Sequence, residues 1–291
     1  MELQQLRYVV AVAEERSFTR AGERCFVVQS ALSHQVKALE RELGVTLFAR
    51  TSRRVEPTAA GEAFLIGARA ALAAAERAVS DAAAASGRIR GQLSIGTIPT
   101  VTAIDLPATL GRFREAYPEV KIRLRSAGSD ELVADLISGG LDVAFLGLPT
   151  GTVPEGVRAR ELSRDRLCAV VGAGHRFADR RRLRLGDLAE ETFVDFTAGT
   201  PGRAQSDLAF AAAGLTREVT FETMSTELML ALVQQGLAVA FLARAVVPEG
   251  RGVRTIAVTG GPSRVEYLAW SDFNPSPAAR AFLGLLDQPR P

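Results

Sequence analysis

The segment that most restricts how this chain can fold is residues 27–44, VVQSALSHQVKALERELG. Its apolar side chains recur at steps of four, three and four residues, which is the period of a helix buried along one stripe. The apolar positions are Leu32, Val36, Leu39 and Leu43. The opposite face of the same helix carries Gln29, Ser30, Ser33, His34 and Lys37. A polar face of this kind is usually only solvated, so the neighbouring segments decide whether it has a function.

Residues 1–57 predict three short helices followed by a basic loop. Apolar stripes mark the first two helices, Ser17 offers an N-cap oxygen to the second, and residues 26–28 leave room only for a tight connection to the third. Two short helices joined by about three residues, with a polar outer face on the second, are typical of a helix-turn-helix. The apolar VTLF and the basic ARTSRRVEP, closed by Pro57, then predict a wing beside it.

Charge is distributed unevenly along the chain. Residues 1–58 carry nine Lys/Arg and seven Asp/Glu, whereas the remainder carries 26 of each sign. The formal excess of +2 therefore lies entirely in the first fifth of the sequence. An excess of this size is weak on its own, but it marks this region as the candidate contact for a polyanion.

Residues 58–87 predict one long helix that pairs with another helix. Alanine fills almost half of the segment, and Leu65, Leu72 and Val79 recur every seven residues. Alanines follow each of them three positions later, which makes an a/d heptad seam. A single helix lying on its own domain is the alternative, but a seam of small residues over three heptads favours close helix pairing.

Residues 91–291 alternate apolar strands with helices, twice over, which predicts an open α/β sheet with parallel strands in each of two lobes. Strands such as LSIGTI, VKIRLR and LDVAFLGL belong to the first half, and LCAVV, FVDF, VTFET and LAVAFL to the second. We expect VEYLAW and the last helix to return to the first lobe, so that lobe 1 covers about 91–162 and 266–291 and lobe 2 about 163–265.

The run SFTRAGERC…VQSALSHQVKALERELGVTLFARTSRRVEPTAAGEAFL resembles the N-terminal region of LysR-type transcriptional regulators. The match is close over residues 1–65, and the layout of the rest is similar to the same family. Three positions depart from its pattern: Val28 replaces a capping Ser or Thr, Gly22 an alanine and Cys25 a leucine. Gly22 should reduce helix stability by about 0.5–1 kcal/mol, and Val28 leaves the cap of the recognition helix to Ser30 or to a phosphate.

The resemblance implies a fold and a set of partners. It implies an all-α winged helix-turn-helix over 1–57, a linker and dimerisation helix over 58–87, and over 88–291 an α/β two-lobed effector-binding domain similar to periplasmic solute-binding proteins. The partners would be double-stranded DNA with an inverted-repeat operator, a small-molecule effector and further copies of the chain, as a dimer and then a tetramer. Residues 29–37 would enter a major groove, and three arginines would contact phosphates or the minor groove: Arg50, Arg53 and Arg54.

An effector site is expected where strands end, because ligands of open α/β sheets settle beyond the carboxyl ends of strands. Most of these ends carry hydroxyls, and several open helices whose free N–H groups favour anions. By resemblance, Thr100 and Ser129 fall where family members hold an effector carboxylate, so a small carboxylate or similar polar metabolite would suit the cleft. The full candidate set is Thr97, Thr100, Val101, Ser129, Leu146, Phe196, Thr200, Thr223 and Ser225.

Other functions find less support in the sequence. No H-E-x-x-H, G-x-S-x-G or Walker loop is present, so we expect no enzyme, catalytic residue, cofactor or metal. The first residues do not form a signal peptide and no apolar run could span a membrane, which predicts a cytoplasmic protein without a membrane partner. A solute-binding protein of a transporter would need an export signal, and a peroxide sensor would need two nearby cysteines, whereas Cys25 and Cys168 lie far apart.

Overall fold

The computed structural model describes residues 1–50, 54–250, 252–271 and 275–287, and of Arg50 only the backbone. It divides the chain into two compact units, which we describe separately. Unit 1 is Met1–Gly91 with Ser138–Gly140, and unit 2 is Gln92–Ile137 with Leu141–Pro291. Among the helices within the described ranges, none combines the length and apolar character needed to span a lipid bilayer.

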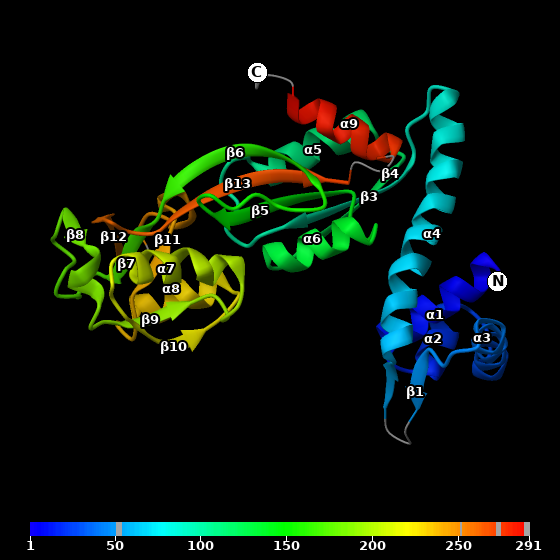
Figure 1. Cartoon of the computed structure of the whole chain (residues 1–291). Helices are drawn as coiled ribbons and strands as arrows, with labels where there is room; N and C mark the ends of the chain where they lie inside the picture. The colour runs from blue at the N-terminus through cyan, green and yellow to red at the C-terminus, as the bar shows by residue number, and fades with distance from the viewer. Residues whose placement is uncertain (51–53, 251, 272–274, 288–291) are drawn as a thin grey trace. The chain divides into compact units, whose positions relative to one another are not determined.

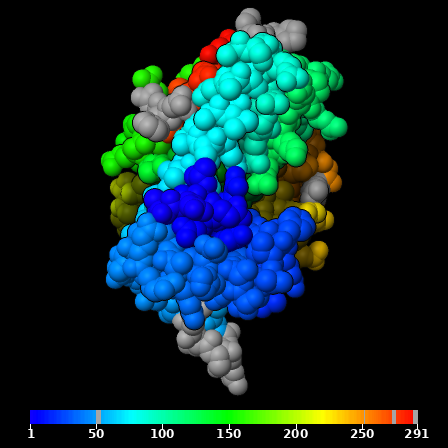
Figure 2. Space-filling model, turned by 90° about the vertical axis from the view of Figure 1, so that its right-hand side faces the viewer, coloured from blue at the N-terminus to red at the C-terminus, as the bar shows by residue number. Residues whose placement is uncertain are grey.

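Unit 1 consists of three helices, a two-stranded wing and one long helix (Figure 1). These elements are α1 (Leu3–Glu15), α2 (Phe18–Arg24), α3 (Gln29–Leu43), β1 (Phe48–Arg50), β2 (Val55–Pro57) and α4 (Ala59–Ala85). Strands β1 and β2 pair in antiparallel register, with Phe48 opposite Pro57. The predicted winged helix-turn-helix is confirmed. In Figure 2, helices α1 to α3 (blue) form one continuous surface.

The core of unit 1 forms around the apolar stripe of α3. Leu32, Val36 and Leu39 are fully buried and pack with apolar residues of α1, α2 and β1. The ring of Phe18 meets the ring of Phe48 edge to face, at 5.9 Å between centroids, which ties α2 to the wing. The expected fourth member of the stripe, Leu43, is 37 % exposed because it is the last residue of the helix.

The turn between α2 and α3 explains one departure from the family pattern. A Cβ on Gly22 would lie 2.8 Å from the carbonyl oxygen of Val27, closer than carbon atoms approach in real structures. Gly22 therefore permits a close backbone approach in addition to weakening α2. The start of α3 has no side-chain cap at Val28, in agreement with the expectation from the sequence. Phe26 has a φ of 56° and is 94 % exposed.

Thr58 caps the start of helix α4, because its hydroxyl accepts a hydrogen bond from the Gly61 N–H. The start of the predicted heptad seam belongs to the core of unit 1, since Leu65 is buried there. Further along the same stripe Val79 is 61 % exposed. The part of the seam beyond α1 is thus the part available to a partner helix.

Unit 2 contains the alternating strands and helices that the sequence predicts, with additional strands. Its helices are α5 (Leu106–Ala116), α6 (Ser129–Ile137), α7 (Pro201–Ala212), α8 (Thr226–Gln234) and α9 (Pro277–Asp287). The strands of the first lobe are β3 (Gly91–Thr97), β4 (Val120–Ser126), β5 (Val143–Pro149), β6 (Arg158–Arg166) and β13 (Ser263–Trp270). Those of the second are β7 (Cys168–Gly172), β8 (Arg182–Arg184), β9 (Thr192–Asp195), β10 (Glu218–Glu222), β11 (Ala240–Leu242) and β12 (Val253–Thr259).

The sheets of unit 2 are mixed, so the expectation of parallel sheets was too simple. The five-stranded sheet has the order β4-β3-β5-β13-β6; β3 and β5 are parallel, but β13 is antiparallel to both of its neighbours. The four-stranded sheet has the order β11-β7-β12-β8, and β9 pairs with β10 separately. The chain leaves lobe 1 after Arg166 and returns at Ser263, a few residues away from the expected limits 162 and 266.

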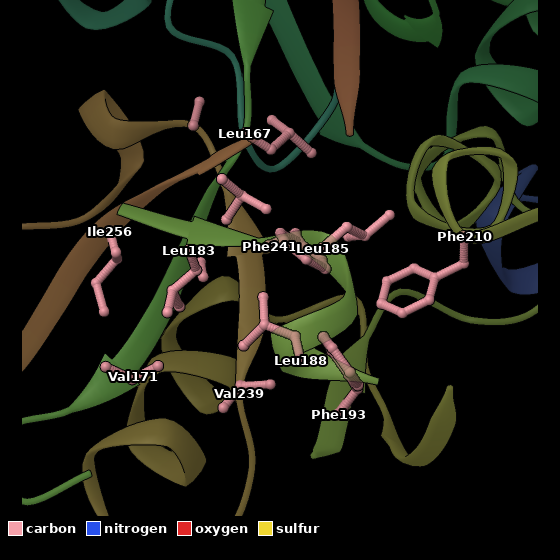
Figure 3. Packing of buried hydrophobic residues seen from close by; sticks show 13 residues of the cluster. Leu167, Val171, Leu183, Leu185, Leu188, Phe193, Phe210, Val239, Phe241 and Ile256 are labelled. Carbon is pink, nitrogen blue, oxygen red and sulfur yellow. The ribbon is translucent and has the colours of Figure 1, made fainter. Parts of the chain in front are cut away.

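Each lobe has its own apolar core. In lobe 1, helices α5 and α9 lie on one side of the sheet and α6 on the other (Figure 1), with Phe113 and Phe282 in edge-to-face contact at 5.4 Å. In lobe 2, Phe193, Phe210 and Phe241 pack together with the aliphatic residues shown in Figure 3. This second core lies directly behind part of the candidate site, because Phe241 also lines the cavity described below.

Candidate functional site

The outer face of α3 presents the predicted DNA-reading side chains to solvent. Gln29, Ser30, His34 and Lys37 are exposed, and Ser33 is half-buried. Because Leu32, Val36 and Leu39 fix the opposite face in the core, these polar residues lie on one side of a helix that cannot rotate. A shallow groove lined by His34, Lys37, Arg41 and Thr46 continues this face toward the wing.

The wing is tied to α3 by one carboxylate. Glu40 accepts hydrogen bonds from the backbone N–H groups of Leu47 (2.8 Å) and Phe48 (3.3 Å), so the loop after α3 is fixed to the helix. Arg54, on the wing, has a side chain that is 79 % exposed and 3.8 Å from Glu56. Arg53 lies outside the described residues, and so does the side chain of Arg50.

A cavity in unit 2 lies where the two lobes meet, and the centre of a water molecule can occupy about 30 Å³ of it. Lobe 1 supplies the end of β3, the start of α6 and the middle of β5, whereas lobe 2 supplies the end of β9, the start of α7 and the end of β11. Gln205 of α7 donates a hydrogen bond to the carbonyl oxygen of Gly147 in β5, at 3.2 Å. Its side chain therefore links the two lobes beside the cavity.

The nine predicted effector residues separate into three groups. Thr100, Ser129, Phe196 and Thr200 line the cavity. Ser225 lines a neighbouring hollow that shares Thr200. The remaining four lie elsewhere: Thr97 donates to the Ile98 carbonyl, Val101 and Leu146 pack in the core of lobe 1, and the Thr223 hydroxyl accepts from the Ser225 N–H. Leu146 is fully buried because it packs within the apolar core of lobe 1.

Two of the lining hydroxyls already have backbone partners. The Ser129 hydroxyl accepts from the Gly147 N–H at 3.0 Å and donates to the Gly147 carbonyl at 3.1 Å. The Thr200 hydroxyl accepts from the Arg203 N–H and donates to the Thr197 carbonyl, as an N-cap does. These hydroxyls hold the cavity walls, and only Thr100 keeps a hydroxyl hydrogen without a partner among the described residues.

The sequence reading missed a buried charge cluster in the cavity wall. Arg264 lines the cavity and its side chain is 3 % exposed. Its Nη1 donates to the Thr100 hydroxyl at 2.8 Å, and its Nη2 lies 3.2 Å from Asp165 and forms an ion pair with Glu266. We expected a strand only from Val265 onward, so the charged residue just before it was not considered.

A second buried ion pair supports lobe 2. The Nη2 of Arg217 lies 2.7 Å from Asp195 and 2.7 Å from Asp207, and its guanidinium lies over the rings of Phe193 and Phe210. Burial raises the pKa of Asp195, although the nearby arginine opposes that shift. Asp195 is the last residue of β9 and precedes Phe196 of the cavity, so this pair fixes the strand end that forms the wall.

The thiol pKa of each cysteine is set mainly by burial, which the charge of a nearby arginine opposes. Each is half-buried, and burial raises the thiol pKa of Cys25 and of Cys168. A raised pKa lowers the thiolate fraction at neutral pH and with it the reactivity of the thiol. No cluster of metal-binding side chains is present in the part of the chain that the structure describes.

Comparison with known proteins gives consistent matches along the chain. Residues 3–62 match the family described as bacterial regulatory helix-turn-helix protein, lysR family, and residues 86–289 match the LysR substrate binding domain. An uncharacterized HTH-type transcriptional regulator, YnfL of Escherichia coli (strain K12), is 35% identical over 97% of this chain and 96% of its own length.

Two further similarities concern function and structure. A hydrogen peroxide-inducible genes activator of Dickeya chrysanthemi is 33% identical over 94% of each chain. The crystal structure of full-length CbnR in complex with its target DNA is 27% identical, with a TM-score of 0.69 over 98% of each chain. The helix-turn-helix match, the substrate-domain match and these full-length relatives together show that the chain belongs to the LysR family of transcriptional regulators.

Proposed function

We propose that this regulator reads operator DNA with the exposed face of α3 and is switched by a small molecule bound in the cavity between the lobes of unit 2. The observation that carries the proposal is the pairing of a fixed polar helix face in unit 1 with a built cavity in unit 2. Base edges in a major groove are distinguished by hydrogen-bonding side chains. This face of α3 supplies three of them: the amide of Gln29, the hydroxyl of Ser33 and the ring of His34.

The wing arginines have a different role in this proposal. Arg54 is exposed on a strand-flanked loop and contributes charge rather than a fixed hydrogen-bond pattern, so we expect it to contact phosphate. Purified Gln29→Ala and Arg54→Ala should be measured on specific and random DNA at several salt concentrations. We expect Gln29→Ala to lose about 1–3 kcal/mol of specific binding only. Arg54→Ala should weaken both DNAs and make the salt dependence shallower.

An unchanged ratio of specific to random binding in Gln29→Ala would mean that this face does not read bases. Equal loss on both DNAs in Gln29→Ala would mean that the contacts of α3 do not depend on the DNA sequence.

The cavity proposal rests on the contacts between the lobes. Gln205 bonds to Gly147 across the lobes, and the walls come from both of them. A molecule bound here contacts both lobes at once. If it binds one arrangement of the lobes more tightly than another, it increases the population of that arrangement. We propose that this change alters how DNA-bound copies associate.

Filling the cavity tests this proposal without knowledge of the effector. Ala243 is buried in the lining, and Ala243→Phe would place a ring in the cavity. In cells that carry the variant, expression of a reporter from a promoter that the protein binds should stay at one level across growth conditions. In cells that carry the wild type, reporter expression should vary with the conditions. Operator binding by the purified variant should remain intact. A variant that still responds would place the effector site elsewhere.

Assembly and location are part of the same proposal. We propose that residues 1–57 form the DNA-binding domain, that 58–87 pair two copies through the exposed end of the seam at Val79, and that 88–291 form the effector domain. The exposed seam residue and the unit boundary at Gly91 support this division. Tetramers would form through the effector domains, and a protein that binds chromosomal DNA would work in the cytoplasm.

A peroxide-sensing activator is the second candidate, favoured by the similarity to hydrogen peroxide-inducible activators. Against it, the chain has only two cysteines, Cys25 in unit 1 and Cys168 in unit 2. A disulfide switch within the sensing unit would need two cysteines there. The small-molecule effector therefore remains the better proposal.

A further inference from the structure

The charges around the cavity restrict which effectors can bind, and this inference rests on the function proposed above. Arg264 is the one ionisable side chain among the described residues that line the cavity. Its guanidinium is surrounded by two carboxylates, since Asp165 lies 3.2 Å from Nη2 and Glu266 is ion-paired with the same nitrogen. The group of Arg264, Asp165 and Glu266, which we call the Arg264 cluster, has a formal charge of −1.

Glu266 is fixed in the position where its carboxylate neutralises the charge of Arg264. Its side chain is 1 % exposed and accepts hydrogen bonds from the N–H groups of Thr102 (3.0 Å) and Ala103 (3.0 Å). The Thr102 hydroxyl donates to the same carboxylate at 2.6 Å. An incoming anion therefore cannot displace this carboxylate from Arg264 without leaving several buried donors unpaired.

No second cationic side chain is among the described residues that line the cavity. The hydroxyls of Ser129 and Thr200 are occupied by backbone groups. The neighbouring hollow, which shares Thr200 and Met224 with the cavity, adds the carboxylates of Asp130 and Glu131 in the first turn of α6. Glu131 is paired with Arg125, but Asp130 is exposed and adds negative charge at that helix end.

We propose that the effector carries no net negative charge and that Arg264 and Thr100 hydrogen-bond an uncharged oxygen of it, such as that of an amide, ketone or alcohol. Arg264 retains one Nη1 hydrogen, and Thr100 one hydroxyl hydrogen, without a partner among the described residues. The two groups are bonded to each other at 2.8 Å, so both donors can reach one acceptor atom.

The remaining walls suit an apolar body attached to that oxygen. Phe196, Met224 and Phe241 all line the cavity, and a Cβ on Gly202 would lie 2.8 Å from the ring of Phe196. The proposal differs from the small carboxylate expected by resemblance, because the two carboxylates beside Arg264 were not visible in the sequence pattern.

The test separates ligands by charge before they are identified. A small-molecule extract of the bacterium that encodes the protein is passed over a strong anion-exchange resin at pH 7, which retains anions and lets neutral and cationic molecules through. The unfolding temperature of the full chain is then measured with each fraction. We expect the unretained fraction to raise it and the retained fraction to leave it unchanged.

Two substitutions at Thr100 tie the effect to the cavity. Thr100→Ser keeps the hydroxyl and should keep the shift in unfolding temperature. Thr100→Val removes the hydroxyl and should weaken binding of the unretained fraction by roughly 3- to 10-fold. Equal shifts in Thr100→Val and Thr100→Ser would overturn the role of this pair of donors.

Stabilisation by the retained fraction, lost in Thr100→Val, would overturn the charge inference while leaving the effector site in place. If neither fraction changed the unfolding temperature, for extracts from cells grown on different carbon and nitrogen sources, the proposed function would itself be overturned.

Discussion

Gly61, at the start of α4, is the position where one added methyl group should reduce the stability of the fold most. A Cβ there would lie 2.1 Å from the carbonyl oxygen of Leu47 and 3.3 Å from the Pro57 side chain. That oxygen accepts a hydrogen bond from the Thr58 N–H at 2.9 Å, which joins the wing to α4. Gly61→Ala therefore forces apart the helix and the segment that leads into the wing. Gly67, two turns further along the same helix, has nothing within 4 Å of the equivalent Cβ and is the matched control.

Both substitutions increase helix propensity, but only Gly61→Ala also introduces a steric clash. Replacing glycine by alanine inside a helix stabilises it by about 0.5–1 kcal/mol, and this gain applies to both. Overpacking typically costs 1–3 kcal/mol, and contact with a fixed backbone oxygen puts Gly61→Ala at the upper end of that range. We expect Gly61→Ala to lose about 2 kcal/mol of local stability and Gly67→Ala to gain about 0.5–1 kcal/mol.

Amide hydrogen exchange measures this locally, without assuming that the whole chain unfolds in one step. Peptides covering residues 56–70 should exchange faster than wild type in Gly61→Ala and no faster in Gly67→Ala. Operator binding should weaken in Gly61→Ala alone. Equal protection in the two variants would refute the close contact between α4 and the Leu47 carbonyl.

Two other predictions concern assembly and the second lobe. Val79→Glu places a charge on the exposed part of the heptad seam and should weaken self-association roughly tenfold or more, measured by sedimentation. The control Ala74→Glu, which lies off the seam, should leave self-association unchanged. Weakening by Ala74→Glu and not by Val79→Glu would place the interface elsewhere. Arg217→Met leaves the Asp195 carboxylate buried without its main partner and should lower the free energy of unfolding by about 3–5 kcal/mol at pH 7.5. Burial raises the pKa of Asp195 in the folded state, and a carboxyl of that kind stabilises the fold most at low pH and loses that contribution as the pH rises. The deficit of Arg217→Met in urea unfolding should therefore shrink toward pH 5, and a deficit independent of pH would contradict this account.

The parts of the fold that could be predicted from sequence are those in which one periodicity dominates. The stripe Leu32, Val36, Leu39 determined α3 and with it the polar face. By contrast, β6 is rich in arginine, also carries Glu161 and Asp165, and shows no regular apolar alternation, because it is an edge strand of its sheet. Charged side chains on an edge strand discourage further pairing and also hide the strand from pattern recognition.

Part of the cavity lining could be predicted from the sequence, and an effector site there stays a prediction. Hydroxyls at strand ends predicted a cleft in this region, and Thr100 and Ser129 both line the cavity that the structure has there. Whether a hydroxyl faces a ligand or its own backbone depends on tertiary contacts, and Ser129 bonds to Gly147, 18 residues away. Arg264 is 164 residues from Thr100 in the sequence, so no local pattern could bring the two together.

The central claim, that α3 reads operator sequence in this regulator, is tested most directly by mapping the binding sites of the tagged protein on the chromosome of its own bacterium, for wild type and for Gln29→Ala. The account predicts discrete sites that share one motif with two-fold symmetry in the wild type, and loss or degeneration of that motif in the variant with protein levels unchanged. Binding spread evenly over the chromosome in the wild type, or the same sites with the same motif in Gln29→Ala, would contradict it.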